Sequence, residues 1–144
     1  MRKKALNLLG LMRRANAIQI GETNTGAAVR AGKAKLLLLA CDASDNAKSR
    51  AAGFVHGRST ICVTLPFTKE EISTHVGVNG CSMAAVTDIG FANALMKTLA
   101  AISPEEYSPL AEETERRLVR AQRRAGEAKA HERNKRTGKR RTNI

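Results

Sequence analysis

The sequence predicts an α/β fold, in which short helices alternate with short apolar strands around a sheet of about four strands. The strongest signal is the run Leu36 to Leu39, four leucines in succession bounded by Gly32 and Asp42. Such a run is typical of a strand that is covered on both faces. Helix-start residues and terminal glycines separate this run from the other apolar segments. The length of 144 residues allows one substantial core, whereas a second full domain would be cramped.

The first elements follow from helical periodicity and from glycine stops. Residues 3–15 place their large apolar side chains on one helical face, and two arginines in the last turn complement the helix dipole. A short strand over residues 17–20 precedes Gly21. A helix over about residues 22–31 then ends at Gly32, a usual C-terminal stop. This strand and helix form the first βα unit, and the leucine strand follows it.

The remaining elements are marked by capping residues, by Pro66 and by apolar runs. Thr68 and Glu71 have the spacing of a capping box, and Asp88 precedes an apolar helical pattern. The expected elements are a helix from the caps at 42–45 to about His56, a buried strand at 60–63, a helix from Thr68 to about Val76, a loop at 77–80, a strand at 83–87 and a core helix from Asp88 to about Leu99.

The C-terminal part differs from the rest in charge. Residues 1–115 hold 13 Lys/Arg and 11 Asp/Glu, whereas residues 116–144 hold 12 Lys/Arg against two glutamates, so most of the net charge of +12 lies in the tail. We expect a globular domain over residues 1–102, a mostly solvated charged helix over 103–131 and a basic, disordered tail over 132–144. A polycation of this kind favours nucleic-acid phosphate over an acidic membrane surface. The expected phosphate contacts of the tail are Arg133, Lys135, Arg136, Lys139, Arg140 and Arg141.

Cysteine usage and hydropathy indicate the compartment. Cys41, Cys62 and Cys81 are widely spaced and form no CxxC pair, so we expect buried free thiols and neither a disulfide framework nor a zinc site. No apolar run approaches the length that a bilayer needs, and no signal peptide is visible. The expected location is the cytoplasm.

Residues suited to catalysis are not grouped in the sequence. His56, His75 and His131 are scattered near predicted helix ends or in the tail, and there is no P-loop, GxGxxG or HExxH motif. The GxxG spacing of Gly77 and Gly80 lacks basic residues within the loop and indicates a plain connection. We therefore expect a protein that is not an enzyme and that carries no cofactor or metal.

Two segments in the expected order resemble a known family. LNLLGLMRRANAIQIGETNTGAAVRAGKAKLLLLACDAS and MAAVTDIGFANAL are similar to the bacterial branch of the ribosomal protein L-seven-Ae and L-thirty-e family, which includes small kink-turn RNA-binding proteins; the resemblance covers about residues 4–100. It implies a three-layer α-β-α sandwich, for which we expect a mixed sheet of about four strands, plus the C-terminal basic helical extension. It also implies an RNA surface, made by the start of the second helix and the loop before the last strand.

Carried over to this chain, the resemblance implies two groups of RNA-binding residues. One group is Gly21, Glu22, Thr23 and Asn24 with Arg30 or Lys33, and the other is Gly77, Val78, Asn79 and Gly80. Two positions depart from the pattern of strong kink-turn binders. Thr23-Asn24 stands where they carry Asn-Glu, and Ala27 stands where they carry a lysine.

These observations lead to a non-catalytic RNA-binding protein that recognises bent, kink-turn-like RNA and is associated with the ribosome or another ribonucleoprotein. Its expected partners are structured RNA and other proteins of such an assembly. An alternative is a protein-interaction module in a ribonucleoprotein, with only non-specific RNA affinity from the tail. A third is the substrate-binding domain of an RNA-modifying enzyme, which would need a catalytic partner.

Overall fold

The computed structural model describes residues 2–137 and confirms the predicted α/β class. Its elements are α1 (Arg2–Arg14), β1 (Ile18–Ile20), α2 (Glu22–Arg30), β2 (Leu36–Leu39), α3 (Asp45–Val55), β3 (Ile61–Thr64), α4 (Lys69–Val76), β4 (Met83–Val86), α5 (Ile89–Ile102) and α6 (Pro104–Thr137). Each element up to α5 begins and ends within a few residues of its predicted bounds.

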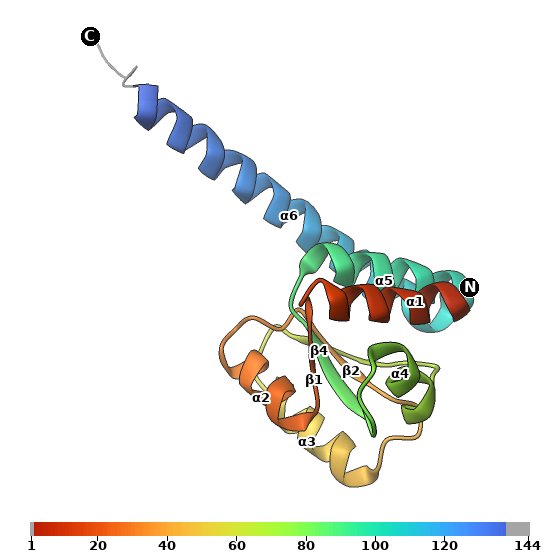
Figure 1. Ribbon diagram of the computed structural model, residues 1–144. Coiled ribbons are helices and arrows are strands. Elements are labelled where there is room, and N and C mark those ends of the chain that lie inside the picture. Colours follow the sequence, from red (N-terminus) through yellow and green to blue (C-terminus); the bar gives the residue numbers. More distant parts are fainter. Residues whose placement is uncertain (1, 138–144) are drawn as a thin grey trace.

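The described strands form one mixed sheet of four, in the order β1-β4-β2-β3. β4 is antiparallel to both of its neighbours, whereas β2 and β3 are parallel. Figure 1 shows helices on both sides of this sheet, with α1 and α5 on one side and α2 and α3 on the other. The expected three-layer α-β-α sandwich with a mixed sheet is therefore confirmed.

The leucine strand contributes side chains to the core on both faces of the sheet, because successive side chains along a strand point to opposite faces. Leu36 and Leu38 belong to the larger core cluster with α1 and α5, whereas Leu37 and Leu39 belong to the cluster beneath α2 and α3. All of the leucines in this strand are buried. An unbroken apolar run is thus what a central strand between two helical layers requires.

Side-chain caps fix the starts of three helices. Ser44 accepts a hydrogen bond from the Ala47 N–H at the start of α3, and Asp88 accepts from the Phe91 N–H at the start of α5. At α4 both bonds of the predicted capping box between Thr68 and Glu71 are present. The Thr68 N–H and then Arg2 donate to the Glu71 carboxylate and lower its pKa.

β3 is less buried than the sequence predicted, because it lies at the edge of the sheet. Only Val63 is buried in this strand, whereas Cys62 and Thr64 are exposed. The expectation that the cysteines are buried is likewise wrong for Cys41 and Cys62, although all three are free thiols. Cys81 is buried as expected, and burial raises the pKa of its thiol.

Helix α6 extends further and is better anchored than the sequence suggested. It starts at Pro104 and contains Pro109, and its first turns contribute Tyr107 and Ala111 to the larger core cluster. The expectation of a mostly solvated helix therefore fails for these turns, which pack against α5. Beyond them α6 projects away from the sandwich (Figure 1) and continues to Thr137, past the predicted end at His131. Residues 138–144 of the predicted tail lie outside the described residues.

Substitution of Tyr107 tests directly how the first turns of α6 are held against the sandwich. Its hydroxyl donates a hydrogen bond of 2.6 Å to the Thr64 carbonyl oxygen, and burial raises its pKa to about 12. We expect Tyr107→Phe to lower the free energy of unfolding by about 0.5 to 1.5 kcal/mol at pH 7, the net contribution of one hydrogen bond. Urea unfolding followed by circular dichroism measures this difference.

The difference in unfolding free energy between the wild type and Tyr107→Phe should also depend on pH. The pKa of Tyr107 is higher in the folded chain than its unfolded value of about 10. The stability that it contributes is thus complete below about pH 10 and is lost as the pH rises towards about 12. The difference between the wild type and Tyr107→Phe should shrink over that interval. Equal stabilities at pH 7 would contradict the proposed role of the hydroxyl.

Candidate functional site

The start of α2 and the loop before β4 meet at one end of the sheet. The Gly21 N–H donates to the Met83 carbonyl at 3.0 Å, and the Ala40 N–H donates to the Ser82 carbonyl at 2.9 Å. The ends of β1 and β2 therefore lie beside the start of β4. This arrangement brings Gly21–Asn24 and Gly77–Gly80 to the same end of the molecule, as the resemblance implied.

α2 differs from α3, α4 and α5 at its start. Its N-cap is Gly21, and no side chain of the described residues hydrogen-bonds to its first-turn N–H groups. Uncapped N–H groups together with the helix dipole attract a phosphate or another anion. A Cβ atom at Gly21 would meet nothing within 4 Å, so the surface above this turn is open.

The Asn24 side chain is partly committed to the fold. Its Nδ2 donates to the Ile20 carbonyl oxygen at 2.9 Å, which ties the first turn of α2 to the end of β1. In the described part of the chain, no hydrogen bond engages its Oδ1. Asn24 is exposed, as is the neighbouring Thr23, so both can meet a ligand. The amide of Asn24 thereby keeps an acceptor and one further donor for recognition.

The loop from Gly77 to Gly80 has a backbone that requires its glycines. Gly77 ends α4 with φ of 74°, and Gly80 has φ of 69°, both in the left-handed region. The Cys81 N–H donates to the Ser73 hydroxyl at 2.9 Å and fixes the end of the loop on α4. Val78 is half-buried against the larger core cluster, which leaves only part of its side chain for contact with a base.

A shallow groove of about 430 Å³ runs between this loop and α4. Asn79 and Gly80 line it, together with Asp42, Lys69 and Glu70. The Asp42 carboxylate accepts a hydrogen bond from the Lys69 N–H at 2.8 Å and so joins the end of β2 to the start of α4. The charge around this groove is mixed. Strong electrostatic attraction therefore has to come from elsewhere in the chain.

Arg50 is a residue of this end that sequence reasoning missed. Its Nη1 lies 2.8 Å from Glu22 Oε2, so a guanidinium from α3 stands beside the start of α2. Arg50 is well exposed, whereas position 27, one turn further along α2, carries only an alanine. A cation is therefore present near this helix start although the family's lysine is not. No local pattern could have found it, because the pairing joins two separate helices.

Arg30 and Lys33 do not lie with the other predicted site residues. They come at the end of α2 and in the turn before β2, so they lie at the opposite end of the sheet. Arg58 caps that end of α2, because its Nη1 donates to the Val29 carbonyl at 3.2 Å. The side chains of the tail residues Arg133, Lys135 and Arg136 are not described, and Lys139, Arg140 and Arg141 lie outside the described residues.

Other kinds of site find little support in the described residues. They contain no group of three or more His, Cys, Asp or Glu side chains that could hold a metal ion. They also contain no helix that is long and apolar enough to cross a membrane. His75 Nδ1 lies 3.0 Å from the Glu71 carbonyl oxygen one turn earlier in α4, so this ring serves its own helix.

The fold and this end of the sheet define a small α-β-α protein with an uncapped helix start beside a glycine loop. The chain is 36% identical over 91 residues to the RNA-binding protein YlxQ of Enterococcus faecium, an alignment that covers 63% of this chain and 86% of that protein. The chain therefore belongs to the same family as YlxQ. A scan against models of protein families finds no match.

Two solved structures share the fold. One is a protein of unknown function from Bacillus halodurans C, with a TM-score of 0.59 and 26% identity, and the alignment covers 64% of this chain and 92% of that one. The other is the 15.5 kD RNA-binding protein of Giardia lamblia, with a TM-score of 0.54 and 19% identity over 69% of this chain and 84% of that one. The second likeness, at this level of identity, concerns the fold alone.

Proposed function

We propose that this protein binds structured RNA without catalysis, and that it recognises a bent, kink-turn-like RNA with the end of the sheet that holds Gly21–Asn24 and Gly77–Gly80. The observation that carries the proposal is the uncapped start of α2 beside the glycine loop. The name of its relative YlxQ as an RNA-binding protein supports it. We place the protein in the cytoplasm, associated with the ribosome or another ribonucleoprotein.

In this proposal the two sides of the site have different tasks. The free N–H groups of α2 receive a phosphate of the RNA backbone, and Arg50 adds a cation beside them. The Asn24 amide reads a base edge, because it offers both a donor and an acceptor. The loop side supplies backbone and the exposed part of Val78 to an unstacked base. Arg30 and Lys33 have no part in this site.

Asn24 is the residue that tests the proposal. We expect Asn24→Ala to weaken binding to a kink-turn RNA by roughly 5- to 150-fold, the effect of losing about 1 to 3 kcal/mol of base recognition. The weakening should persist at every salt concentration, because the amide carries no charge. Binding of labelled kink-turn RNA and of a plain RNA duplex, followed by fluorescence anisotropy, measures the change.

Asn7→Ala is the matched control, because Asn7 is an exposed asparagine of α1, which takes no part in the site. It should leave both affinities unchanged. Asn24 also bonds to Ile20, so the fold of each variant is checked by circular dichroism before binding is compared. If Asn24→Ala discriminates between kink-turn and duplex as well as the wild type does, this end of the sheet is not the recognition site.

If the protein is instead a protein-interaction module, an RNA pull-down should give a different result. An RNA pull-down from cells would then recover nothing beyond what a polycation control recovers, while a protein partner would be retained in stoichiometric amount. Crosslinking the protein to RNA in cells and sequencing the attached RNA identifies the ligand if the proposal holds.

A further inference from the structure

A second groove lies at the opposite end of the sheet from the proposed RNA site. It has a volume of about 440 Å³ and runs between α6 and the turns that precede β2 and β3. Lys35 and Ser59 come from these turns, and Ile89 comes from the start of α5. β2 separates this groove from Gly21 and the glycine loop by its four residues, a span of about 13 Å.

The described residues that line this groove carry four cations and one carboxylate. Arg117, Arg120 and Arg124 follow one another at the i, i+3 and i+7 positions of α6 and therefore share one face of the helix. Lys35 faces them from the turn before β2, and Glu113 is the carboxylate. We call this set the basic groove.

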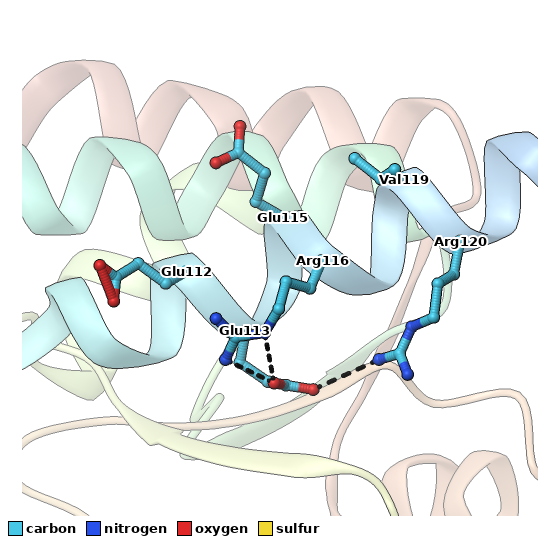
Figure 2. A pocket seen from close by; sticks show the side chains of 6 residues that line it. All are labelled: Glu112, Glu113, Glu115, Arg116, Val119 and Arg120. Atoms are coloured by element: carbon cyan, nitrogen blue, oxygen red, sulfur yellow. Dashed lines mark hydrogen bonds and ion pairs between the residues drawn. The ribbon is translucent and has the colours of Figure 1, made fainter.

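Hydrogen bonds hold the α6 wall of the basic groove in place. Arg117 donates to the Ser59 carbonyl oxygen and, at 2.8 Å, to the Glu113 carboxylate. Figure 2 shows Arg116 and Arg120 also directed at Glu113, at 2.8 and 3.6 Å. Arg117 and then Arg116 lower the pKa of Glu113 to about 2, so these contacts persist at neutral pH.

This anchor fixes α6 against the sandwich and leaves other cations of the groove available. Lys35 and Arg124 form no ion pair with any described residue. Arg30, Lys33 and Arg58 add further positive charge at the same end of the sheet. Cations on a preformed wall are favourable for an anionic ligand, because less side-chain freedom is lost on binding.

We propose that the basic groove binds the phosphate backbone of a second RNA segment, so that one copy of the protein can bridge two segments. Its ability to bridge rests on the proposed function of the first site, whereas phosphate binding in the groove does not. The two surfaces lie at opposite ends of the sheet, which permits simultaneous contact with two segments.

The chemistry of the groove selects a phosphate backbone over a base or an acidic protein. Arginine forks match phosphate oxygens in geometry. Ile89 is the largest apolar side chain among the described residues that line it, and none of these residues is aromatic. Stacking on bases and the buried apolar anchors of a protein interface both need such side chains. The groove is therefore suited to contacts that do not depend on sequence.

The first experiment measures the binding of a labelled plain RNA duplex to the full chain between 50 and 200 mM salt. Arg124→Glu and Lys35→Glu should each weaken binding and remove about one phosphate contact from the salt slope. The loss of affinity over this salt range should then be about 3.5-fold smaller than in the wild type. Arg123→Glu is the matched control, since it makes the same change one position away at an exposed residue that does not line the groove.

Two outcomes of this experiment would contradict phosphate binding by the basic groove. Equal effects of Arg123→Glu and Arg124→Glu would mean that α6 acts as a diffuse polycation. An unchanged slope in Lys35→Glu would mean that the turn before β2 takes no part. Lys35 belongs to the globular part, so this variant still tests the groove if Arg124→Glu perturbs α6.

The second experiment measures bridging. Kink-turn RNA is immobilised, the protein is bound to it, and capture of the labelled plain duplex is followed. The wild type should capture the duplex, and Arg124→Glu should capture less while it stays bound to the kink-turn RNA. Absence of capture by the wild type would overturn bridging. Asn24→Ala should keep its duplex affinity in solution, so failure of the first site and failure of the groove give different results.

Discussion

Deleting residues 116–144 should flatten the salt dependence of RNA binding and lower affinity by orders of magnitude at low salt. The deletion removes 12 Lys/Arg and two glutamates, whereas the remaining chain has a net charge of only +2. Each phosphate contact contributes about 0.9 to the slope of log affinity against log salt. If six of these cations contact phosphate, the wild type loses about 1,000-fold in affinity between 50 and 200 mM salt, and the shortened chain loses far less. Anisotropy of a labelled duplex measures both slopes.

A shorter deletion separates the tail from the basic groove. Removing residues 125–144 keeps Arg117, Arg120 and Arg124 in place and keeps the bond from Arg117 to Ser59. This chain should retain part of the slope that the longer deletion loses. It should also still prefer kink-turn RNA over duplex, because the proposed recognition site lies on the globular part. A slope that is the same in both shortened chains and the wild type would show that residues 116–144 do not contact RNA.

Replacing Leu37 with alanine should lower the free energy of unfolding by about 2 to 5 kcal/mol, towards the upper part of that range. Leu37 is fully buried between the sheet and the layer of α2 and α3. Most of its neighbours in that cluster are alanines, such as Ala28 and Ala47. Side chains this short cannot move into the space that the leucine leaves, so the cavity persists. Urea unfolding measures the change.

Leu11→Ala is the matched control for this prediction, because Leu11 is 45% exposed on α1. The same change there should alter stability by no more than about 0.5 kcal/mol, as is usual for surface positions. Leu37 also supports α2, whose first turn carries Asn24. A loss below about 1 kcal/mol in Leu37→Ala would show that this layer repacks easily.

The sequence predicted the elements well wherever a local signal marks them. Patterns of only a few residues predicted three of these elements: the four leucines of β2, the capping box at Thr68 and Glu71 before α4, and the N-cap Asp88 before α5. These signals act over one or two turns of helix or one strand. Periodicity and caps are therefore sufficient for them.

The errors concern features that depend on the order of the strands. Thr60 to Val63 has the composition of a buried strand, but its position at the sheet edge leaves Cys62 exposed and Ile61 only half-buried. The docking of α6 was missed for a related reason. Tyr107 reaches Thr64 across 43 positions of sequence, and a contact of that separation leaves no periodic trace in either segment.

The candidate site shows the same division. The resemblance placed Gly21–Asn24 and the glycine loop together, and the hydrogen bond from the Gly21 N–H to the Met83 carbonyl brings them to one end of the sheet. The resemblance also grouped Arg30 with them, yet the length of α2 carries it away. Arg50 is far from them in sequence and stands beside Glu22. Nearness in sequence therefore does not ensure nearness in space once a helix is longer than about two turns.

The hydrogen bonds that α6 makes to β3 and to the turn before it also bear on how the chain behaves during synthesis. The Ile61 and Leu65 N–H groups donate to the Lys35 and Leu39 carbonyl oxygens on the β2 side, so the Thr64 carbonyl faces the free edge, where it accepts from the Tyr107 hydroxyl. Arg117 occupies the Ser59 carbonyl just before the strand. An edge strand with open carbonyl groups is a template for another strand. During synthesis this edge stays open until α6 has emerged, so chains that end before α6, and therefore lack Tyr107, should self-associate more than the full chain.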